Sequence, residues 1–313
     1  MSVIEDYSFV RYLSSKKSID DRALNRFVWD NLVAVLRPTS PQSPLRVLEL
    51  GAGIGTMVER LIDWGLLTRA DYTSVEINAD CIEEFWKRIG RWTSSNGFEL
   101  IWDSAVTACI QRGKSQICVN LIKNDVYDFF ETKEMSTKWD LGLAHAFMDL
   151  VDIADVLPKF CSLIKPGGLL YLTLTYDGET ILMPKLDRHL DDHILQLYNQ
   201  SMDERLKNGR KSGNSQAGRH LFHHLKKANT KILAAGSSDW VVFAKEQGYA
   251  NDESYFLHYI IHTIQTELNG HLSLTDKELE SWVQKRHAQI EKGELNFIAK
   301  PLDFLAQGPT DGQ

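Results

Sequence analysis

The sequence is poor in the features that mark a disulfide-rich, secreted or membrane-spanning protein. Only 4 of its 313 residues are cysteines, and Cys81, Cys109, Cys118 and Cys161 show no short paired spacing. We therefore expect neither a disulfide framework nor a cysteine-based zinc site, and a reducing cytoplasm is the expected compartment. No apolar run reaches the roughly 18 residues of a membrane-spanning helix, and the N-terminus lacks the apolar stretch of a signal peptide.

The sequence also has fewer basic than acidic residues. The 35 Lys and Arg residues are outnumbered by 42 Asp and Glu residues, which gives a net charge of −7. Because neutralising a phosphate backbone requires a surplus of cations, a nucleic-acid partner is not expected. The 43% of hydrophobic residues is typical of a soluble globular protein and excludes a disordered chain.

Strand-like and helix-like segments alternate between residues 45 and 175. Before them, residues 19–36 predict one amphipathic helix, and residues 37–44, with three prolines, predict a connection. The alternation implies a mostly parallel sheet wrapped by helices, with a ligand at the carboxyl ends of its strands. The predicted strands are 45–50, 71–77, 116–122, 139–144 and 169–175, and the predicted helices are 56–65, 79–93 and 153–164.

The rest of the chain is less regular. We expect three parts: an N-terminal helical arm (1–40), a ligand-binding core (41–175) and a part that completes the sheet (176–313). In the last part we predict helices at 190–206, 219–228, 253–268 and 275–292, strands at 230–235, 240–244 and 294–305, and a polar glycine-rich loop at 208–218.

The strongest motif is a glycine-rich segment, Val47-Leu-Glu-Leu-Gly51-Ala-Gly53-Ile-Gly55-Thr56, between a predicted strand and a predicted helix. Glycines there allow positive φ and a close approach of the backbone to a ligand. A dinucleotide fingerprint has the spacing G-x-G-x-x-G. Here the third glycine comes one position too early, and an acid, Glu49, lies two residues before the first glycine.

The pattern E-x-G-x-G-x-G resembles motif I of the class I S-adenosylmethionine-dependent methyltransferases, and the resemblance covers roughly residues 45–175. It implies that Glu76, ending the second strand, accepts the cofactor's ribose hydroxyls, and that Asp125, after the third strand, faces the adenine amino group. Taken alone, Glu76 fits a solvated strand-end carboxylate, but the order of the motifs favours the cofactor. The turn 165–168 (Lys-Pro-Gly-Gly) resembles the one before the fifth strand in this family. The implied cofactor-binding residues are Glu49, Gly51, Ala52, Gly53, Gly55, Thr56, Glu76, Ile77, Asp125, Val126 and Ala144.

The resemblance implies a doubly wound α/β fold with about seven strands, the last antiparallel. It also implies an N-terminal helical lid and helical insertions near the C-terminus that cover the substrate. The expected activity is methyl transfer from S-adenosyl-L-methionine to oxygen or nitrogen of a small molecule. The segment 144–147 (Ala-His-Ala-Phe) stands where many nucleic-acid amino methylases have an N-P-P-Y-like sequence, which argues against that activity. A protein methyltransferase, an aminopropyl-type transferase and a silent cofactor-binding module stay open as alternatives, and so does a homo-oligomer.

Three residues after the fourth and fifth predicted strands are candidate catalytic residues. His145 is a candidate general base, or a structural histidine near the cofactor. Tyr176 and Asp177 are candidate substrate contacts facing the same cleft, or simply turn residues before Gly178.

Several other clusters admit two interpretations. The pairs His220/His224 and His258/His262 have metal-ligand spacing, but no third acidic ligand is evident, so no metal is expected. The basic stretch 207–211 is expected to decorate a loop, and the loop 212–219 is expected to cap a helix rather than bind an anion. The arm 7–22 is expected to act as a lid or to pack as a fixed arm. Aromatic residues expected in the core rather than in a pocket are Trp240, Tyr249, Tyr255, Phe256 and Tyr259.

Overall fold

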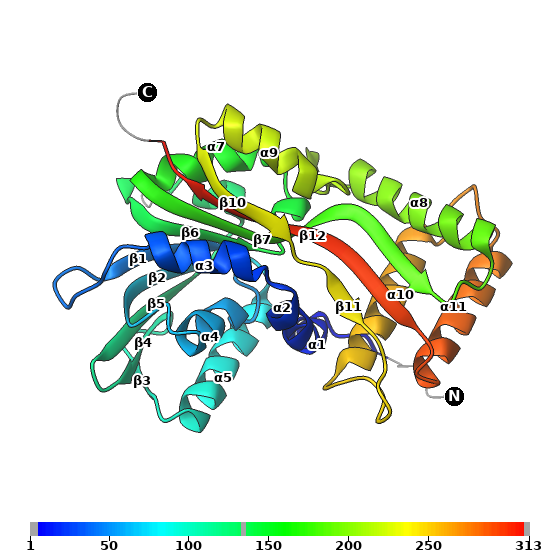
Figure 1. Cartoon of the computed structure of the whole chain (residues 1–313), viewed down its shortest axis with the longest axis horizontal. Coiled ribbons are helices and arrows are strands. Elements are labelled where there is room, and N and C mark those ends of the chain that lie inside the picture. Colours follow the sequence, from blue (N-terminus) through cyan, green and yellow to red (C-terminus); the bar gives the residue numbers. More distant parts are fainter. Residues whose placement is uncertain (1–5, 133–135, 310–313) are drawn as a thin grey trace.

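Ten strands form one mixed sheet in the computed structural model, which describes residues 6–132 and 136–309 (Figure 1). At one end of the sheet β11 (Trp240–Val242) pairs with β12. From that end the strands follow in the order β10 (Lys231–Ser237), β12 (Asn296–Gln307), β7 (Ile164–Met183), β6 (Trp139–His145), β1 (Leu45–Leu50), β2 (Arg69–Glu76), β5 (Ser115–Lys123), β4 (Thr107–Arg112) and β3 (Glu99–Trp102).

The strand directions match the doubly wound fold. β7, β6, β1, β2 and β5 are parallel to one another, whereas β12 is antiparallel to both β7 and β10, and β4 is antiparallel to β5. The predicted sheet of about seven strands with an antiparallel last strand is therefore confirmed. The sheet has three further strands, the β3–β4 pair beyond β5 and the short β11. All seven residues of β6 are buried, as expected for a central parallel strand covered on both faces.

Helices cover both faces of the sheet (Figure 1). On one face, α3 (Arg26–Val35), α4 (Thr56–Asp63) and α5 (Ala79–Ser95) bury apolar side chains against the central strands. On the other face lie α6 (Val126–Phe129), α7 (Ile153–Leu163) and α9 (Ala217–Lys227), together with the short 3-10 helix η2 (Met148–Leu150). The two layers hold the carboxyl ends of the strands in fixed positions.

The extended halves of β7 and β12 carry a third apolar cluster. It includes side chains from α2 (Lys17–Ala23), α8 (Arg188–Glu204), α10 (Glu253–Leu268) and α11 (Asp276–Glu291), and α1 (Phe9–Ser15) packs against it. A separate two-stranded sheet, β8 (Leu206–Lys207) with β9 (Arg210–Lys211), follows α8. The predicted helical insertions near the C-terminus are thus present.

Two predictions of elements are wrong, and four strands were missed. The single helix at 19–36 is two helices, because Asn25 caps α3 by accepting from the Val28 N–H, and its own N–H donates to Asp303. The strands β3, β4, β8 and β9 were not predicted at all. The strand predicted at 169–175 runs from 164 to 183, and the Pro-Gly-Gly segment is a bulge within it, since Trp139 pairs with Ile164 but Leu141 with Leu169.

The expectation of no disulfide is also wrong. Cys109 of β4 and Cys118 of β5 face each other across the antiparallel pair and are disulfide-bonded. Cys81 and Cys161 are free and buried. Within the part of the chain that the structure describes, no helix combines the length and apolarity needed to cross a bilayer.

Candidate functional site

The glycine loop follows β1 and opens α4. Gly51, Gly53 and Gly55 all have positive φ, between 54° and 81°. A Cβ at Gly51 would lie 2.2 Å from Phe147, and one at Gly55 would lie 2.9 Å from Phe85. Both positions therefore require glycine for the conformation and for the space.

Glu76 ties the loop to the end of β2. Its Oε2 accepts the Gly53 N–H at 2.8 Å, and its Oε1 accepts the N–H groups of Ile77 and Asn78, each at 2.8 Å. A carboxylate offers about four acceptor positions. Three are occupied by backbone donors, so at least one remains for a ligand hydroxyl.

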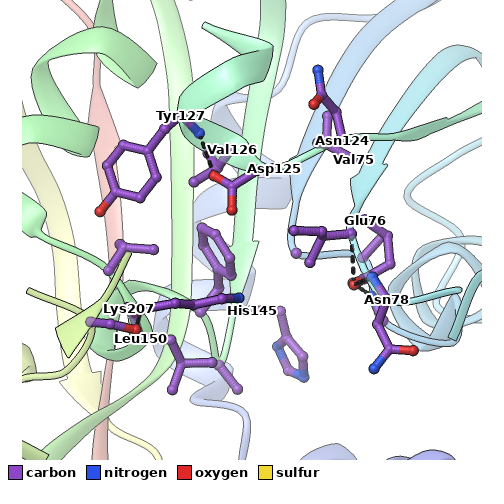
Figure 2. A pocket seen from close by; sticks show the side chains of 18 of the residues that line it. Val75, Glu76, Asn78, Asn124, Asp125, Val126, Tyr127, His145, Leu150 and Lys207 are labelled. Carbon is purple, nitrogen blue, oxygen red and sulfur yellow. Dashed lines mark hydrogen bonds between the residues drawn. The ribbon is translucent and has the colours of Figure 1, made fainter. Parts of the chain in front are cut away.

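A pocket of about 830 Å³ lies at the carboxyl ends of β6, β1, β2 and β5 (Figure 2). This volume is near the upper end of the usual range for small-molecule sites, about 300–1,000 Å³. The pocket brings together most of the predicted site residues. Those that line it are Glu49, Gly51, Ala52, Gly53, Thr56, Glu76, Ile77, Asp125, Val126 and His145.

Two predicted cofactor contacts do not line the pocket. Gly55 is the N-cap of α4 and packs against Phe85, so its role is in the backbone and the packing. Ala144 is fully buried in the apolar cluster beneath the pocket. The structure therefore places neither residue where it could contact a ligand in the pocket directly, as was predicted.

Glu49 is a buried acid at the floor of the pocket. It is 1% exposed, and the Tyr72 hydroxyl donates to its Oε2 at 2.8 Å. Burial raises the pKa of Glu49 to about 8. A ligand cation placed beside it would favour the ionised form and lower that pKa.

The N-terminal arm forms the roof. Phe9 and Leu13 of α1 and its C-cap residue Lys16 line the pocket, and their spacing of four and three residues places them on one side of the arm. Leu13 Cδ1 lies 3.4 Å from the position of a Cβ on Gly53. The arm therefore covers the glycine loop directly.

A network of buried charges fixes this roof to the sheet. Asp21 of α2 accepts from Arg60 Nε of α4 at 2.7 Å, and Asp20 forms an ion pair with Lys16 at 3.0 Å and lies 3.3 Å from His145 Nε2. Burial alone would raise the pKa of Asp20, but Lys16 and then His145 hold it below its ordinary value. The side chains of Arg60 and Asp20 are 0% and 2% exposed.

His145 has a partner at each ring nitrogen. Its Nδ1 lies 2.8 Å from Thr173 Oγ1, and its Nε2 faces Asp20 and, at 3.4 Å, Arg60. Burial lowers the pKa of His145 to about 4, against the opposing effect of Asp20. The imidazole is thus neutral at pH 7, and its nitrogens bond to the protein.

Tyr176 and Asp177 do not lie where they were predicted. β12 pairs with β7 as far as Met183, so both residues lie within the strand rather than after it. The Tyr176 hydroxyl bonds to Thr180 and Asn199, each at 3.0 Å, and Asp177 pairs with Arg219 at 2.9 Å. Neither residue lines the pocket, so the prediction that they face it is wrong.

The histidine pairs have partners other than metals. His258 contacts His287 at 2.7 Å and Glu291 at 2.9 Å, and His262 stacks on Tyr7 at 4.0 Å. In residues 6–132 and 136–309 no group of three or more candidate ligands is placed to hold a metal ion.

The predicted aromatic cluster belongs to the C-terminal core. Tyr255 and Phe256 are buried, and Trp240 and Tyr249 pack against the third apolar cluster, which confirms the core interpretation for these four. Tyr259 stacks on Tyr12 at 4.3 Å.

Sequence reasoning missed part of the pocket wall. Asp125 is the N-cap of α6 and accepts the Tyr127 N–H at 2.9 Å, which places Tyr127 in the wall. The residues 205–206 were expected to end a helix and the stretch 207–211 to decorate a loop, yet the β8–β9 hairpin that they form lines the pocket. The Asn208-Gly209 pair was the available signal, because Asn-Gly favours a two-residue hairpin turn. Further lining residues that were not predicted are Asn78, Asn124, Phe147, Leu150 and Val151.

Comparison with known proteins adds little to this geometry. No protein-family model matches the chain, and no curated protein matches it. Among solved structures, a Haemonchus contortus phosphoethanolamine N-methyltransferase 2, bound to phosphomonomethylethanolamine and S-adenosylhomocysteine, is 13% identical over 97% of this chain with a TM-score of 0.42. This chain spans 59% of that protein's length.

Two further structures are similar at the same level. A Mycobacterium tuberculosis cyclopropane synthase is 12% identical, covering 97% of this chain and 86% of its own, with a TM-score of 0.41. A Streptomyces coelicolor A3(2) geranyl diphosphate C-methyltransferase is 10% identical, covering 98% and 88%, with a TM-score of 0.45. Likeness this distant does not decide function, which has to be argued from the pocket.

Proposed function

We propose that this chain binds S-adenosyl-L-methionine and transfers its methyl group to a small molecule. The observation that carries the proposal is one pocket that combines a glycine loop with Glu49, Glu76 and Asp125, from three neighbouring strand ends. Carboxylates accept hydrogen bonds and attract cations. They suit a ligand whose sugar hydroxyls, purine amino group and ammonium group are all donors and whose sulfonium is positive.

The same acids argue against a nicotinamide dinucleotide. A pyrophosphate is bound by unoccupied backbone N–H groups at a glycine loop and helix N-terminus. Here the Gly53 N–H donates to the Glu76 carboxylate, whose charge would repel a phosphate.

The lining residues divide into those that hold the cofactor and those that exclude water. Glu76 would accept from the sugar, Asp125 would face the purine with Val126 against its ring, and Glu49 would face the ammonium group. When bound, the cofactor supplies an electrophilic methyl carbon. Alignment of the acceptor and exclusion of water by α1 can contribute about 7–11 kcal/mol.

The role of His145 as a general base remains a prediction, and the geometry favours its structural alternative. A base acts best when its pKa is near the working pH. With a pKa of about 4 and both nitrogens bonded to the protein, His145 is poorly placed to take a proton. An oxygen or nitrogen nucleophile that is already unprotonated at neutral pH suits this pocket best.

The roof over the pocket favours a small acceptor over a protein side chain. Phe9, Leu13 and Lys16 cover the glycine loop, whereas a protein substrate needs an open cleft. Aminopropyl-type transfer and cofactor binding without turnover remain alternatives, and each predicts a different product.

Binding of S-adenosylhomocysteine tests the cofactor assignment. By isothermal titration, Glu76→Ala should lose measurable affinity while its circular dichroism stays that of the wild type. Glu280→Ala, an exposed glutamate on α11, is the matched control and should bind normally. Unchanged affinity in Glu76→Ala would contradict the proposed sugar site.

Incubation with methyl-labelled cofactor and metabolite extracts tests the reaction. A labelled product heavier than its precursor by one methyl group supports methyl transfer. A mass gain of an aminopropyl group, or binding with no product, would favour the alternatives.

A further inference from the structure

The acids and most of the cations that line the pocket come from different segments of the chain. The acids Glu49, Glu76, Asp125 and Asp128 come from the strand ends and α6. The cations come mainly from one segment, residues 205–211, which we call the basic hairpin. It holds four cations in seven residues, in a chain whose net charge is −7. Its cations are Arg205, Lys207, Arg210 and Lys211.

The hairpin is regular and firmly attached. Asn208 and Gly209 have φ of 53° and 75°, as the turn of a two-residue hairpin requires. The Ser212 N–H donates to Arg205 O at 2.9 Å, and the Asn214 N–H donates to Asp149 O at 3.2 Å. The first bond closes the hairpin, and the second fixes its end to the segment that follows β6.

The pairing within the hairpin is electrostatically unfavourable. Lys207 and Arg210 stand directly opposite each other on β8 and β9. Like charges in that position destabilise a strand pair. Nothing in the fold of the hairpin itself requires two cations there, whereas a bound anion would relieve their repulsion.

The four cations also lack acidic partners. In the described part of the chain, no ion pair involves Arg205, Lys207, Arg210 or Lys211. Arg210 lies 4.6 Å over the Tyr127 ring, and Arg205 Nε donates to a backbone carbonyl, although the charge of Arg205 also counteracts burial, which raises the pKa of Asp149. Unneutralised cations around a concave site raise the local concentration of anions.

Lys207 of the hairpin lies across the pocket from Glu76, while Arg210 lies over Tyr127 of α6. In Figure 2, Lys207 and Leu150 lie on the opposite side of the view from Glu76 and Asn78, with His145 between them. One side therefore suits a cation and the other an anion. S-adenosylmethionine, which carries a sulfonium and an ammonium group, belongs on the acidic side.

We propose that the basic hairpin binds an anionic group, a phosphate or a carboxylate, of the methyl acceptor. The inference rests on the proposed function, because it assigns the substrate class of that reaction. The hairpin holds the anionic end of the acceptor while the cofactor occupies the glycine loop. A neutral acceptor would leave four like charges at the pocket wall without a counter-ion.

Anion binding can be measured without knowing the acceptor. Inorganic phosphate and acetate are titrated separately by calorimetry into the protein, first alone and then saturated with S-adenosylhomocysteine. The test variant is Lys207→Gln/Lys211→Gln, and the matched control is Lys226→Gln/Lys227→Gln, an exposed pair at the end of α9. Both variants remove two lysine charges, but only the first removes them from the pocket.

We expect one anion to bind the wild type and the control equally, and the hairpin variant about tenfold or more weakly, because charge-assisted hydrogen bonds are lost. Tighter phosphate or tighter acetate binding indicates which anionic group the acceptor carries. S-adenosylhomocysteine affinity should be the same in all three proteins.

Three results would overturn the inference. The first is that no anion binds to the wild type, and the second is that anion binding weakens equally in both variants. The third is that the hairpin variant loses affinity for S-adenosylhomocysteine, because that would assign the hairpin to the cofactor's own carboxylate. A failure of the proposed function would give a different result. The wild type would then not bind S-adenosylhomocysteine, and the anion titration without cofactor would still test the hairpin.

Discussion

Two segments cover the pocket, the N-terminal arm and the basic hairpin, and their charged side chains differ in burial and in ion pairing. In the N-terminal arm the charges beneath the roof are paired, the buried Asp20 with Lys16 and the partly buried Asp21 with the buried Arg60. In the basic hairpin, Lys207 and Lys211 are exposed and have no ion pair in the described residues. A buried charge needs a partner inside the protein, whereas an exposed one does not. The difference indicates that the arm's charges hold structure and that the hairpin's charges are left for a ligand.

The largest expected effect comes from breaking the paired network. Arg60→Ala removes the fully buried cation that pairs with Asp21 and lies 3.4 Å from His145, and the loss of one partner of a buried pair costs up to about 3–5 kcal/mol. We expect the free energy of unfolding in urea to fall by that order.

Arg91→Ala is the control for the network. Arg91 pairs with Glu84 on the surface of α5, where its side chain is 64% exposed. Loss of such a pair costs about 0–1 kcal/mol. Equal losses in the two variants would remove the distinction between structural charges and ligand charges.

A smaller effect concerns the pH dependence that His145 gives to stability. Its pKa is about 4 in the folded protein and 6.5 in an unfolded chain, so the unfolded state binds more protons between these values. Stability is therefore lost as pH falls from 6.5 toward 4, by about 2 kcal/mol at pH 5.

Urea unfolding of the wild type and of His145→Asn at pH 7 and pH 5 measures this contribution. Other titrating groups are common to both proteins and cancel in the difference. The variant should lose about 2 kcal/mol less than the wild type on acidification. Parallel losses would mean that His145 is not buried as a neutral ring under the arm.

Glu49 should give the affinity for S-adenosylhomocysteine a dependence on pH. Its pKa of about 8 means that it is largely protonated at pH 6, and a cofactor ammonium group would bind the ionised form. Affinity for S-adenosylhomocysteine should rise up to about tenfold from pH 6 to pH 7, because each unit of pH frees ten times more carboxylate. Calorimetry should find this slope in the wild type and none in Glu49→Gln. A slope that survives in the variant would assign the titration to another group.

Much of the fold could be predicted because its signals are local. The strand 45–50 and the helix 253–268 were placed with correct bounds, and the glycine loop and the acids after β2 and β5 lie in one pocket as expected. Those features depend on hydrophobic period and on glycine spacing within a few residues.

The errors arose where a contact between distant segments decides the structure. The break at Asn25 depends on Asp303, 278 positions away. The role of His145 depends on Asp20, which lies 125 positions away in the arm. No local pattern in the sequence encodes these distances.

The smallest expected effect is a change in stability that has opposite signs in the hairpin and in the arm. Lys207→Gln removes one of two like charges that face each other across β8 and β9, which should stabilise the hairpin by about 0.2–0.5 kcal/mol. In the arm, by contrast, neutralising a charge destabilises the protein. Amide hydrogen exchange at Arg210 and Ser212 detects the change locally, and it should be slower in the variant at low salt. The gain should shrink at 1 M salt, where the Debye length is about 3 Å. Faster exchange in the variant would mean that Lys207 supports the hairpin, and the contrast between a structural cover and a ligand-binding cover would be lost.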